Sequence, residues 1–394
     1  MVNVADGVGD AATGSSRWHH DHFAKFRPAP ITSQRIRVCI LVGSVDISGG
    51  TYVIFQHAVA LADSGLDVTI ASLMPIGHAA PNWHPALAKL RLISIDSVGD
   101  EQFDVAMATW WRTVYRLPEV RARQYAYFVQ SIESRFATSD DDVSVAEGAA
   151  NTYTFDLFTL TITSLLQTYL AVTFGRPSLL VRNGVRKDLY SPFGPSLRAR
   201  PEQGLRVLVE GPLGIPLKNT ERAIEIACSV TTDVWLLTST PVRSYSGISQ
   251  LCSRIPVDLC AGIYRSCDVL LKLSRVEGMF GPPLEMFHCG GTAVVYDVTG
   301  SEEYIRNGKN ALLVEMEDEV GARDALVELL HDRSLLEGLR AGALRTAALW
   351  PDWTEASATF VDAVLTLANL PDRDHGPLLE SIRSAVPSVS GDHG

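Results

Sequence analysis

The stretch "DVLLKLSRVEGMFGPPLEMFHCGG", residues 268–291, decides the fold of this chain. It begins with an apolar run of strand length, passes through a turn that contains glycines and prolines, and ends in a pattern typical of a helix. Pro282 and Pro283 suit the first turn of a helix, where their missing N–H groups cost little. The stretch therefore predicts a strand, a turn and a helix, which is the repeating unit of a parallel α/β sheet.

The same unit recurs along most of the chain. Short apolar runs rich in β-branched residues alternate with helix-like stretches, from "RIRVCILVG" at residues 35–43 to "NALLVE" at residues 310–315. Residues 191–204, rich in Pro, Gly and Arg, lack periodicity and are the best candidate for a linker. We therefore predict an α/β protein with two doubly wound, Rossmann-like parallel-sheet domains that face a cleft and bind ligands at the carboxyl ends of their strands.

Changes in composition set the expected boundaries of these parts. A tail helix that follows Trp350-Pro351 should pack back on the N-terminal domain, and both ends of the chain are polar and of low complexity. The expected parts are a flexible leader at 1–34, an N-terminal domain at 35–195, a C-terminal domain at 205–350, the tail helix at 351–370 and a flexible tail at 371–394.

Bulk properties exclude several classes of protein. A net charge of -11 argues against a general nucleic-acid binder, whose binding face is basic. No apolar run reaches the ~18–20 residues that a membrane span needs, so we expect at most peripheral contact with a membrane. The leader lacks the apolar core of a secretory signal. The six cysteines show no CxxC pairing, which favours reduced thiols in a cytoplasmic protein.

Two glutamates bracket the turn within "EGMFGPPLE", residues 277–285. A carboxylate accepts hydrogen bonds from sugar hydroxyls well, so Glu277 and Glu285 can grip hydroxyls on either side of a bound anion. An alternative without ligand binding fits the residues equally well. In that reading, Glu285 complements the helix dipole and Glu277 is a solvated loop residue.

The backbone between the two glutamates suits an anion. Gly278 and Gly281 allow a ligand to approach the main chain closely. The N–H groups of Met279, Phe280 and Gly281 can point at the anion, with help from the N-terminus of the helix that follows.

A second candidate for anion binding is Lys218 in "VEGPLGIPLKNTERAIEIA", residues 209–227. It follows a glycine-containing loop and lies just ahead of a helix whose expected cap is Asn219 or Thr220. A lysine in this position is a good clamp for a diphosphate, and a solvated lysine is the alternative.

The N-terminal domain offers a glycine loop, "SVDISGGTY" at residues 44–52, between the first strand and the first helix. Gly50 and Thr51 can bring the backbone close to a ligand, although such a pair is more often an ordinary turn. Trp110 at a strand end suits stacking on a sugar face, and Gln130 or Glu133 can hold an acceptor hydroxyl. Packing is the alternative for these residues.

A local basic face lies in the same part of the chain. Its arginines can attract an anionic acceptor or a lipid headgroup, but a solvated helix face is the favoured reading. The arginines are Arg112, Arg116, Arg121 and Arg123.

Residues 205–350 resemble the donor half of retaining family-4 glycosyltransferases of the GT-B fold. The likeness rests on the pattern Glu, seven residues, Glu, together with "YRSCDVLLKLSRVEG" before it and "CGGTAVVYDVTGSEEYIRNGKNALLVEMED" after it. In the N-terminal domain, "YFVQ" followed by an acid at Glu133 resembles bacterial surface-polysaccharide rhamnosyltransferases of the same family, though only loosely. The resemblance makes the N-terminal domain the acceptor side and the C-terminal domain the nucleotide-sugar-binding side.

The resemblance also implies a role for each candidate residue. Glu277 faces the donor sugar, Glu285 holds the ribose of the nucleotide, and the turn between them sits on the diphosphate. Lys218 meets the donor phosphates, and the glycine loop at Gly50 lets the backbone approach donor and acceptor.

Two departures from the family stand out. The family usually has an arginine after the first glycine of the Lys218 loop, but this chain reads Gly211-Pro212, so phosphate neutralisation rests on Lys218 and backbone N–H groups or on an arginine from elsewhere. A histidine that many family members carry in the N-terminal half has no counterpart that we can place, since His57 lies within a helix and reads as a packed residue.

The function implied is that of a retaining glycosyltransferase, which moves a sugar such as the deoxysugar rhamnose from a dTDP, UDP or GDP donor to a hydroxyl of a glycan or small molecule. No cofactor beyond the donor substrate is expected. No metal is expected either, because the Asp-x-Asp within residues 139–143 reads as an acidic helix start. The alternatives are a nucleotide-sugar epimerase of the GT-B fold and a catalytically silent sugar-binding partner.

Overall fold

The computed structural model describes residues 35–76, 83–136 and 143–387, and its contacts divide them into two units. Unit 1 comprises the described residues up to Thr161, those from Leu166 to Val181 and those from Ser357 onward. Unit 2 comprises Ile162–Leu165 and Arg182–Ala356.

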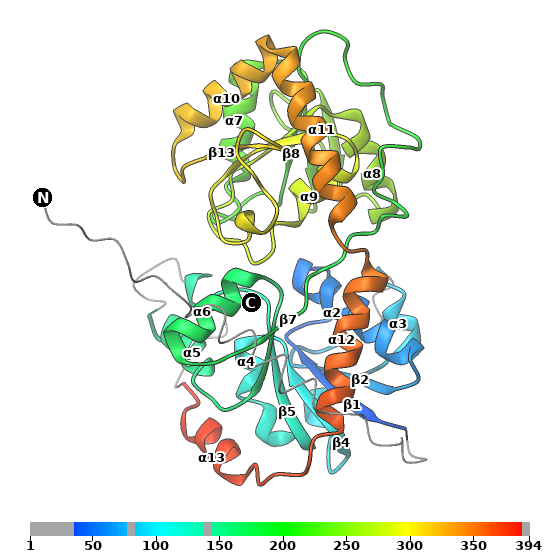
Figure 1. Cartoon of the computed structure of the whole chain (residues 1–394), viewed down its shortest axis with the longest axis vertical. Helices are drawn as coiled ribbons and strands as arrows, with labels where there is room; N and C mark the ends of the chain where they lie inside the picture. Colours follow the sequence, from blue (N-terminus) through cyan, green and yellow to red (C-terminus); the bar gives the residue numbers. More distant parts are fainter. Residues whose placement is uncertain (1–34, 77–82, 137–142, 388–394) are drawn as a thin grey trace, which may run out of the picture. The chain divides into compact units, whose positions relative to one another are not determined.

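Unit 1 is built on a seven-stranded parallel sheet with the strand order β3-β2-β1-β4-β5-β6-β7 (Figure 1). Its strands are β1 Arg37–Val42, β2 Asp67–Ser72, β3 Arg91–Ser94, β4 Gln102–Ala108, β5 Arg121–Val129, β6 Phe158–Thr161 and β7 Leu179–Leu180. The accompanying helices are α2 Gly49–Asp63, α3 Ala86–Lys89, α4 Trp111–Val114, α5 Val143–Thr152, α6 Ser164–Phe174, α12 Trp353–Ala368 and α13 Gly376–Ser384.

Unit 2 is built on a six-stranded parallel sheet with the strand order β10-β9-β8-β11-β12-β13. Its strands are β8 Val207–Glu210, β9 Val234–Thr238, β10 Gln250–Ser253, β11 Val269–Lys272, β12 Thr292–Tyr296 and β13 Leu312–Val314. Its helices are α7 Thr220–Val230, α8 Val257–Ser266, α9 Gly281–His288, α10 Glu319–His331 and α11 Arg333–Leu349.

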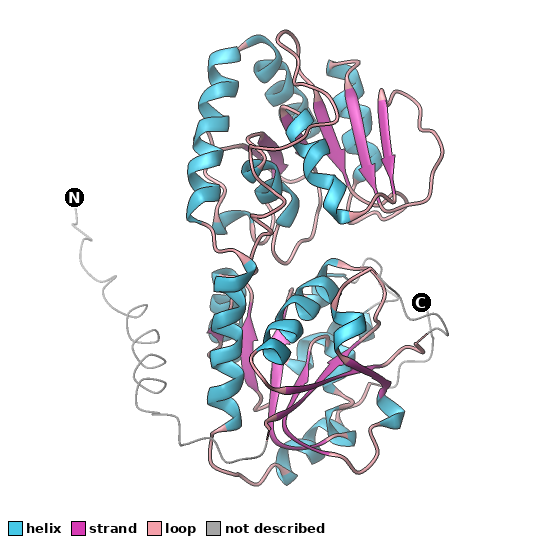
Figure 2. Cartoon of the chain, turned by 90° about the vertical axis from the view of Figure 1, so that its right-hand side faces the viewer, coloured by secondary structure: helices cyan, strands magenta, loops and turns pink. Residues whose placement is uncertain are grey.

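The apolar runs in the sequence become strands that are buried on both faces. In β11 all four residues are buried, and in β1 every residue after Arg37 is buried. Helices cover both faces of each sheet (Figure 2), which is why these strands lack the alternation of a half-exposed sheet. The stretch that decides the fold gives β11, a turn and α9, so the predicted α/β class is confirmed.

Each sheet has a point at which the strand order reverses. In unit 1 it lies between β1 and β4, and in unit 2 it lies between β8 and β11. The loops that leave two such strands run to opposite faces of the sheet, so a crevice opens at their carboxyl ends. The sites in this chain are therefore to be sought after β1 and β4 and after β8 and β11.

Helix α12 packs on unit 1 through its second half. The ring of Phe360 stacks on His57 with centroids 4.4 Å apart, and Ser357 Oγ lies 3.1 Å from His57 Nδ1. Burial lowers the pKa of His57 to about 3. His57 is thus a neutral packing residue of α2, as its place in the sequence indicated.

Three local features differ from the sequence-based expectations. Helix α2 begins at Gly49, within the expected glycine loop, because Ser48 Oγ caps it by accepting from Thr51 N. The expected linker 191–204 packs on unit 2 instead, where the Arg265 guanidinium donates to the carbonyl of Pro195. Part of the expected flexible tail forms helix α13, which starts with a proline at its second position.

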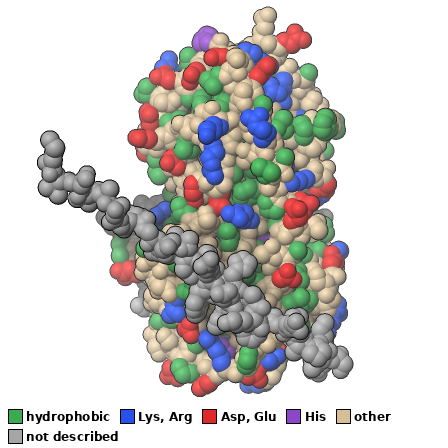
Figure 3. Space-filling model, viewed as in Figure 1, with side chains coloured by type: hydrophobic (Ala, Val, Ile, Leu, Met, Phe, Trp, Pro, Cys, Tyr) green, Lys and Arg blue, Asp and Glu red, His purple; other side chains and the backbone are tan. Residues whose placement is uncertain are grey.

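Some expectations fall on residues outside the described ranges. These are the flexible leader at 1–34 and the acidic helix start at 139–143, of which only Val143, the first residue of α5, is described. Within the described residues, no helix is both long and apolar enough to cross a membrane. On the face of unit 2 seen in Figure 3, basic and acidic side chains are interspersed.

Candidate functional site

The centre of the candidate site in unit 2 is an ion pair between Lys218 and Glu277. Lys218 Nζ lies 2.9 Å from Glu277 Oε1, and the side chain of Glu277 is 10% exposed. Lys218 comes from the loop after β8, and Glu277 comes from the loop after β11. The structure thus brings the two predicted catalytic residues together at the switch point of the sheet.

Backbone contacts fix the lysine in this position. Arg275 N donates to the carbonyl of Leu217 at 2.8 Å, which joins the Lys218 loop to the Glu277 loop. Asn219, the residue that precedes α7, adopts a left-handed conformation with φ of 53°. Gly211 admits no side chain, because an added Cβ would lie 2.4 Å from Thr220 Oγ1.

Arg275, two residues before Glu277, does not take the place of the arginine that the resembled family carries in this loop. Its guanidinium donates to the Pro216 carbonyl at 2.7 Å and pairs with Glu317 at 2.5 Å. Arg275 therefore stabilises the Lys218 loop by its hydrogen bond to the Pro216 carbonyl. Among the described residues of this loop pair, Lys218 is the cation closest to Glu277.

The turn between the two glutamates presents fewer free amides than expected. Gly281 N already donates to the Met279 carbonyl at 2.9 Å, so the expectation that Gly281 offers its N–H to an anion is corrected. The N–H groups of Met279 and Phe280 have no hydrogen-bond partner among the described residues. The Tyr304 hydroxyl donates to the Phe280 carbonyl and holds the turn in place.

Gly300, in the loop after β12, supports the turn and was missed by sequence reasoning. It has φ of 91°, and an added Cβ would lie 2.6 Å from the Gly278 carbonyl oxygen. Only glycine fits at this position, both for conformation and for space. The available signal was a glycine directly after an apolar strand, in "YDVTG".

Glu285 lies on α9 in a strongly perturbed environment. Burial and, next, the negative charge of Glu210 raise the pKa of Glu285 to about 7. Hydrogen bonds from the phenols of Tyr264 and Tyr190 and the positive charge of Lys272 act in the opposite direction. A carboxylate that titrates near neutrality marks a candidate binding site.

A second ion pair adjoins Glu285 and was also missed. Lys272 Nζ lies 2.6 Å from Glu210 Oε2 and 3.1 Å from the Glu210 carbonyl oxygen. Burial alone lowers the pKa of Lys272, but the charges of Glu210 and Glu277 more than offset it, and the net pKa is raised. Charged residues at the ends of "VLVE" and "VLLK", two otherwise apolar strands, were the signal.

In unit 1, the carboxyl ends of β1, β4 and β5 gather three of the predicted acceptor-side residues. A Cβ added to Gly50 would lie 3.4 Å from Gln130 Nε2. A Cβ added to Gly43 would lie 2.8 Å from the Trp110 ring, which therefore rests on the end of β1. Thr51 lies in the same turn of α2 as Gly50, with its Oγ1 2.8 Å from Ser48 Oγ.

The fourth predicted acceptor-side residue, Glu133, faces the interior. Its Oε2 accepts hydrogen bonds from the Tyr127 hydroxyl and from Trp111 N, both at 2.7 Å. Burial raises the pKa of Glu133 to about 7. The expectation of direct contact with an acceptor is therefore corrected, because the carboxylate is 7% exposed and serves to fix the turn that carries Trp110 and Trp111.

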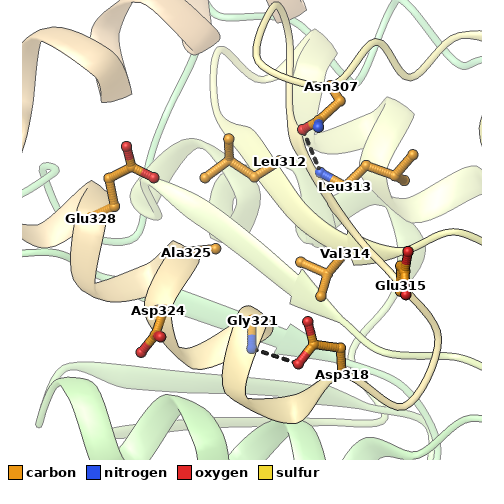
Figure 4. A pocket seen from close by; sticks show the side chains of 10 residues that line it. All are labelled: Asn307, Leu312, Leu313, Val314, Glu315, Asp318, Gly321, Asp324, Ala325 and Glu328. Carbon is orange, nitrogen blue, oxygen red and sulfur yellow. Dashed lines mark hydrogen bonds between the residues drawn. The ribbon is translucent and has the colours of Figure 1, made fainter.

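A cavity of about 500 Å³ lies elsewhere in unit 2, between β13 and α10 (Figure 4). Its lining includes Glu315, Asp324 and Glu328, and Asp318 uses its carboxylate to cap α10 by accepting from Gly321 N at 2.9 Å. An acidic wall disfavours a diphosphate, so this cavity is distinct from the candidate site. No cluster among the described residues has the three His, Cys, Asp or Glu side chains of a metal site.

Comparison with solved structures establishes the fold. HepE of Anabaena in complex with UDP and glucose aligns with a TM-score of 0.66 and 14% identity, over 84% of this chain and 99% of that chain. The solved structures that resemble this chain are glycosyltransferases of the GT-B fold, so the chain has that fold.

Sequence comparisons find likeness over parts of the chain. Residues 249–332, which include the Glu277 turn and α9, match the family "Glycosyl transferases group 1". The O-antigen biosynthesis protein RfbC of Myxococcus xanthus is 26% identical over 226 residues, 54% of this chain and 17% of that protein. The D-inositol 3-phosphate glycosyltransferase of Nocardia farcinica is 29% identical over 175 residues, 43% of this chain and 35% of that protein. The matches thus span well under half the length of either relative.

Proposed function

We propose that this chain is a retaining glycosyltransferase, which transfers a sugar from a nucleotide-diphosphate donor to a hydroxyl of a glycan or small-molecule acceptor. The observation that carries the proposal is the pair of Lys218 and Glu277 at the switch point between β8 and β11, beside a turn with free amides at Met279 and Phe280. A cation, free amides and a helix N-terminus at the carboxyl edge of a parallel sheet suit a diphosphate.

The bound donor would redistribute this ion pair. The diphosphate takes Lys218 and the turn amides as partners, which leaves Glu277 to accept hydrogen bonds from the donor sugar. Glu285 accepts from the ribose hydroxyls. As the donor bond breaks, negative charge grows on the departing diphosphate, and Lys218 with the amides stabilises it without rearranging.

Retention then follows from attack on the face that the leaving group occupies. The acceptor oxygen forms a bond to the anomeric carbon, the bond from that carbon to the phosphate oxygen breaks, and the acceptor proton passes to the departing phosphate. No protein base is needed, which agrees with the packing role of His57. Glu277 and Glu285 orient the donor and do not form the acid and nucleophile pair of a glycosidase.

The donor is proposed to be a dTDP-, UDP- or GDP-sugar, with a deoxysugar such as rhamnose among the candidates. HepE was solved with UDP and glucose, and the relative RfbC is an O-antigen biosynthesis protein, so a nucleotide sugar used in glycan assembly fits both. All six cysteines are free thiols, which fits work in a reducing cytoplasm.

A thermal-shift panel of dTDP-, UDP- and GDP-sugars tests the donor. A ligand at 100 times its Kd should stabilise the protein by about 2.7 kcal/mol, whereas a panel without any shift would overturn the proposal. Transfer is then followed with the stabilising donor, with and without EDTA, and the anomeric configuration of the product is read by NMR. Lys218→Gln should lower the transfer rate by roughly 100-fold or more, while the exposed Lys309→Gln serves as the control.

A catalytically silent sugar-binding protein is the second candidate, because the loop arginine of the family is missing and Arg275 is committed to Pro216 and Glu317. Tight donor binding without transfer or donor hydrolysis would favour it. An epimerase of the same fold would interconvert donor sugars in the absence of any acceptor, which the same NMR experiment detects.

A further inference from the structure

The predicted basic face of unit 1 consists of four arginines, and three of them are neutralised. Each of these three forms an ion pair with at least one carboxylate of unit 1, which offsets the positive charge of the arginine. The pairs are Arg116 with Asp96 and Glu119, Arg121 with Asp100, and Arg123 with Asp104 and Asp372.

Arg112 is the exception. It forms no ion pair or hydrogen bond with any residue that the structure describes, in a chain with a net charge of -11. Its guanidinium carbon lies 5.3 Å from the centroid of the Trp110 ring and 5.2 Å from that of Trp111. Contact with the ring faces holds the group in place but uses none of its five N–H donors.

The indoles that hold Arg112 are themselves fixed. Trp110 rests on Gly43 at the end of β1, and Trp111 N donates to the buried carboxylate of Glu133. Arg112 therefore stands on a rigid platform rather than on a mobile loop. Such pre-organisation reduces the entropy that a long side chain loses when it binds.

The two indoles and Arg112 lie beside the residues that are expected to meet the acceptor. Arg112 lies on α4, the helix after β4, at the switch point of the seven-stranded sheet, on the edge where Gly50 and Gln130 also lie. A guanidinium with free N–H donors binds a carboxylate or phosphate through two parallel hydrogen bonds. The same edge holds the residues expected to meet the acceptor.

We propose that Arg112 recognises an anionic group, a carboxylate or a phosphate, on the acceptor. The inference rests on the proposed function, since it names the class of acceptor that the transferase would take. It also separates Arg112 from its neighbours Arg116, Arg121 and Arg123, which stabilise unit 1 and do not select a substrate.

The test measures binding of three small probes by ligand-observed NMR, with the most stabilising nucleotide present. D-glucuronate carries a carboxylate, D-glucose 6-phosphate carries a phosphate, and D-glucose is neutral. At least one anionic probe should bind the native protein tenfold or more tightly than D-glucose, and raising the salt concentration should narrow the difference. A preference for D-glucuronate points to an acidic sugar, and a preference for D-glucose 6-phosphate points to a phosphorylated acceptor.

Variants assign the effect to the guanidinium. Arg112→Gln should remove the preference for the anionic probe, and Arg112→Lys should restore part of it. The matched control is Arg116→Gln, which removes a neutralised arginine and should leave the preference unchanged. The melting temperature of each variant reports on its folding.

Three results would overturn the inference. In the first, the native protein binds all three probes with equal affinity. In the second, Arg112→Gln weakens binding of the charged and the neutral probes by the same factor. In the third, Arg116→Gln loses the preference for the anionic probe as fully as Arg112→Gln does. Nucleotide binding is recorded in the same samples. If nucleotides bind and no anionic preference exists, only this inference fails, whereas absence of nucleotide binding defeats the proposed function itself.

Discussion

At the residue scale, the candidate donor site consists of two ion pairs. Each joins a residue at or after the end of β8 to a residue at or after the end of β11. Lys218 with Glu277 and Lys272 with Glu210 both lie at the β8–β11 switch point, and Glu285 is adjacent to the second pair. The charges are mutually neutralised in the free protein. A dianionic ligand can therefore enter by exchanging partners with Lys218 instead of meeting an uncompensated charge.

The two glutamates of the turn should differ in what they do. Glu285→Ala should weaken nucleotide binding about tenfold or more, since it removes a charge-assisted partner of the ribose. Glu277→Ala should leave nucleotide affinity nearly unchanged and reduce the transfer rate. Calorimetry with the nucleotide and initial rates with the nucleotide sugar separate the two effects. Native nucleotide affinity in the Glu285 variant would contradict its assignment.

Donor affinity should depend on pH through Glu285. Because its pKa is raised to about 7, the ionised form that accepts from ribose is the major form above pH 7 and becomes the minor form below it. The Kd for nucleotide should therefore rise by roughly tenfold per unit as the pH falls below 7. Lys272→Met removes a charge that favours ionisation, so it should move this transition to higher pH. A Kd that is independent of pH between 6 and 8.5 would refute the assignment.

At the scale of elements, the Glu277 turn is held from three sides. The Lys218 loop is joined to it through Arg275 N, Tyr304 donates to the Phe280 carbonyl, and Gly300 approaches the Gly278 carbonyl. The two prolines shape the first turn of α9. Several elements that are distant in sequence thus determine where the amides of the turn point.

Two glycines of this region allow strain and crowding to be separated. Gly300 has φ of 91° and backbone atoms in the way of a Cβ, whereas Gly308 has φ of 69° and no atom within 4 Å. Gly308→Ala should cost about 1–2 kcal/mol from conformation alone and leave nucleotide binding intact. Gly300→Ala should cost more and weaken nucleotide binding, because the turn must move. Equal unfolding free energies and equal nucleotide affinities for the two variants would exclude this role for Gly300.

At the scale of the whole molecule, the class of fold was predictable because parallel sheets leave continuous apolar runs and a regular alternation with helices. The Glu277 and Glu285 turn was predictable for the same reason, since its acids follow a recognisable strand. Side-chain partners that meet because two strands pair were not predictable. Lys272 and Glu210 meet because β11 and β8 are neighbours in space, and the spacing of residues along the chain does not contain that fact.

Two further misses have similar causes. Glu133 was expected to hold an acceptor hydroxyl, but the phenol of Tyr127 and the amide of Trp111 give it partners inside. Gly281 was expected to offer its amide, but the turn closes on itself through the Met279 carbonyl. In both cases the competing partner is a group whose position only the folded chain defines.

The tail helix α12 should be essential to the stability of unit 1. Phe360 is fully buried and lies 4.4 Å from His57 and 5.3 Å from Phe128, measured between ring centroids. Phe360→Ala should lower the free energy of unfolding by about 3–5 kcal/mol, and Thr359→Ala on the exposed side of α12 should change it little. Denaturant unfolding of the two variants measures the difference. A loss below 1 kcal/mol for Phe360→Ala would show that α12 is not part of the core.

The discontinuity of unit 1 has a consequence for synthesis on the ribosome. Unit 2 is nearly continuous, from residue 182 to residue 356, and its last helices emerge directly after its sheet. The sheet of unit 1 emerges first, yet the surface around His57 and Phe128 lacks its cover until residues 357–368 have left the exit tunnel. Of the two units, the one whose sheet is made first therefore completes its core last, and that apolar face is the one a chaperone would meet during translation.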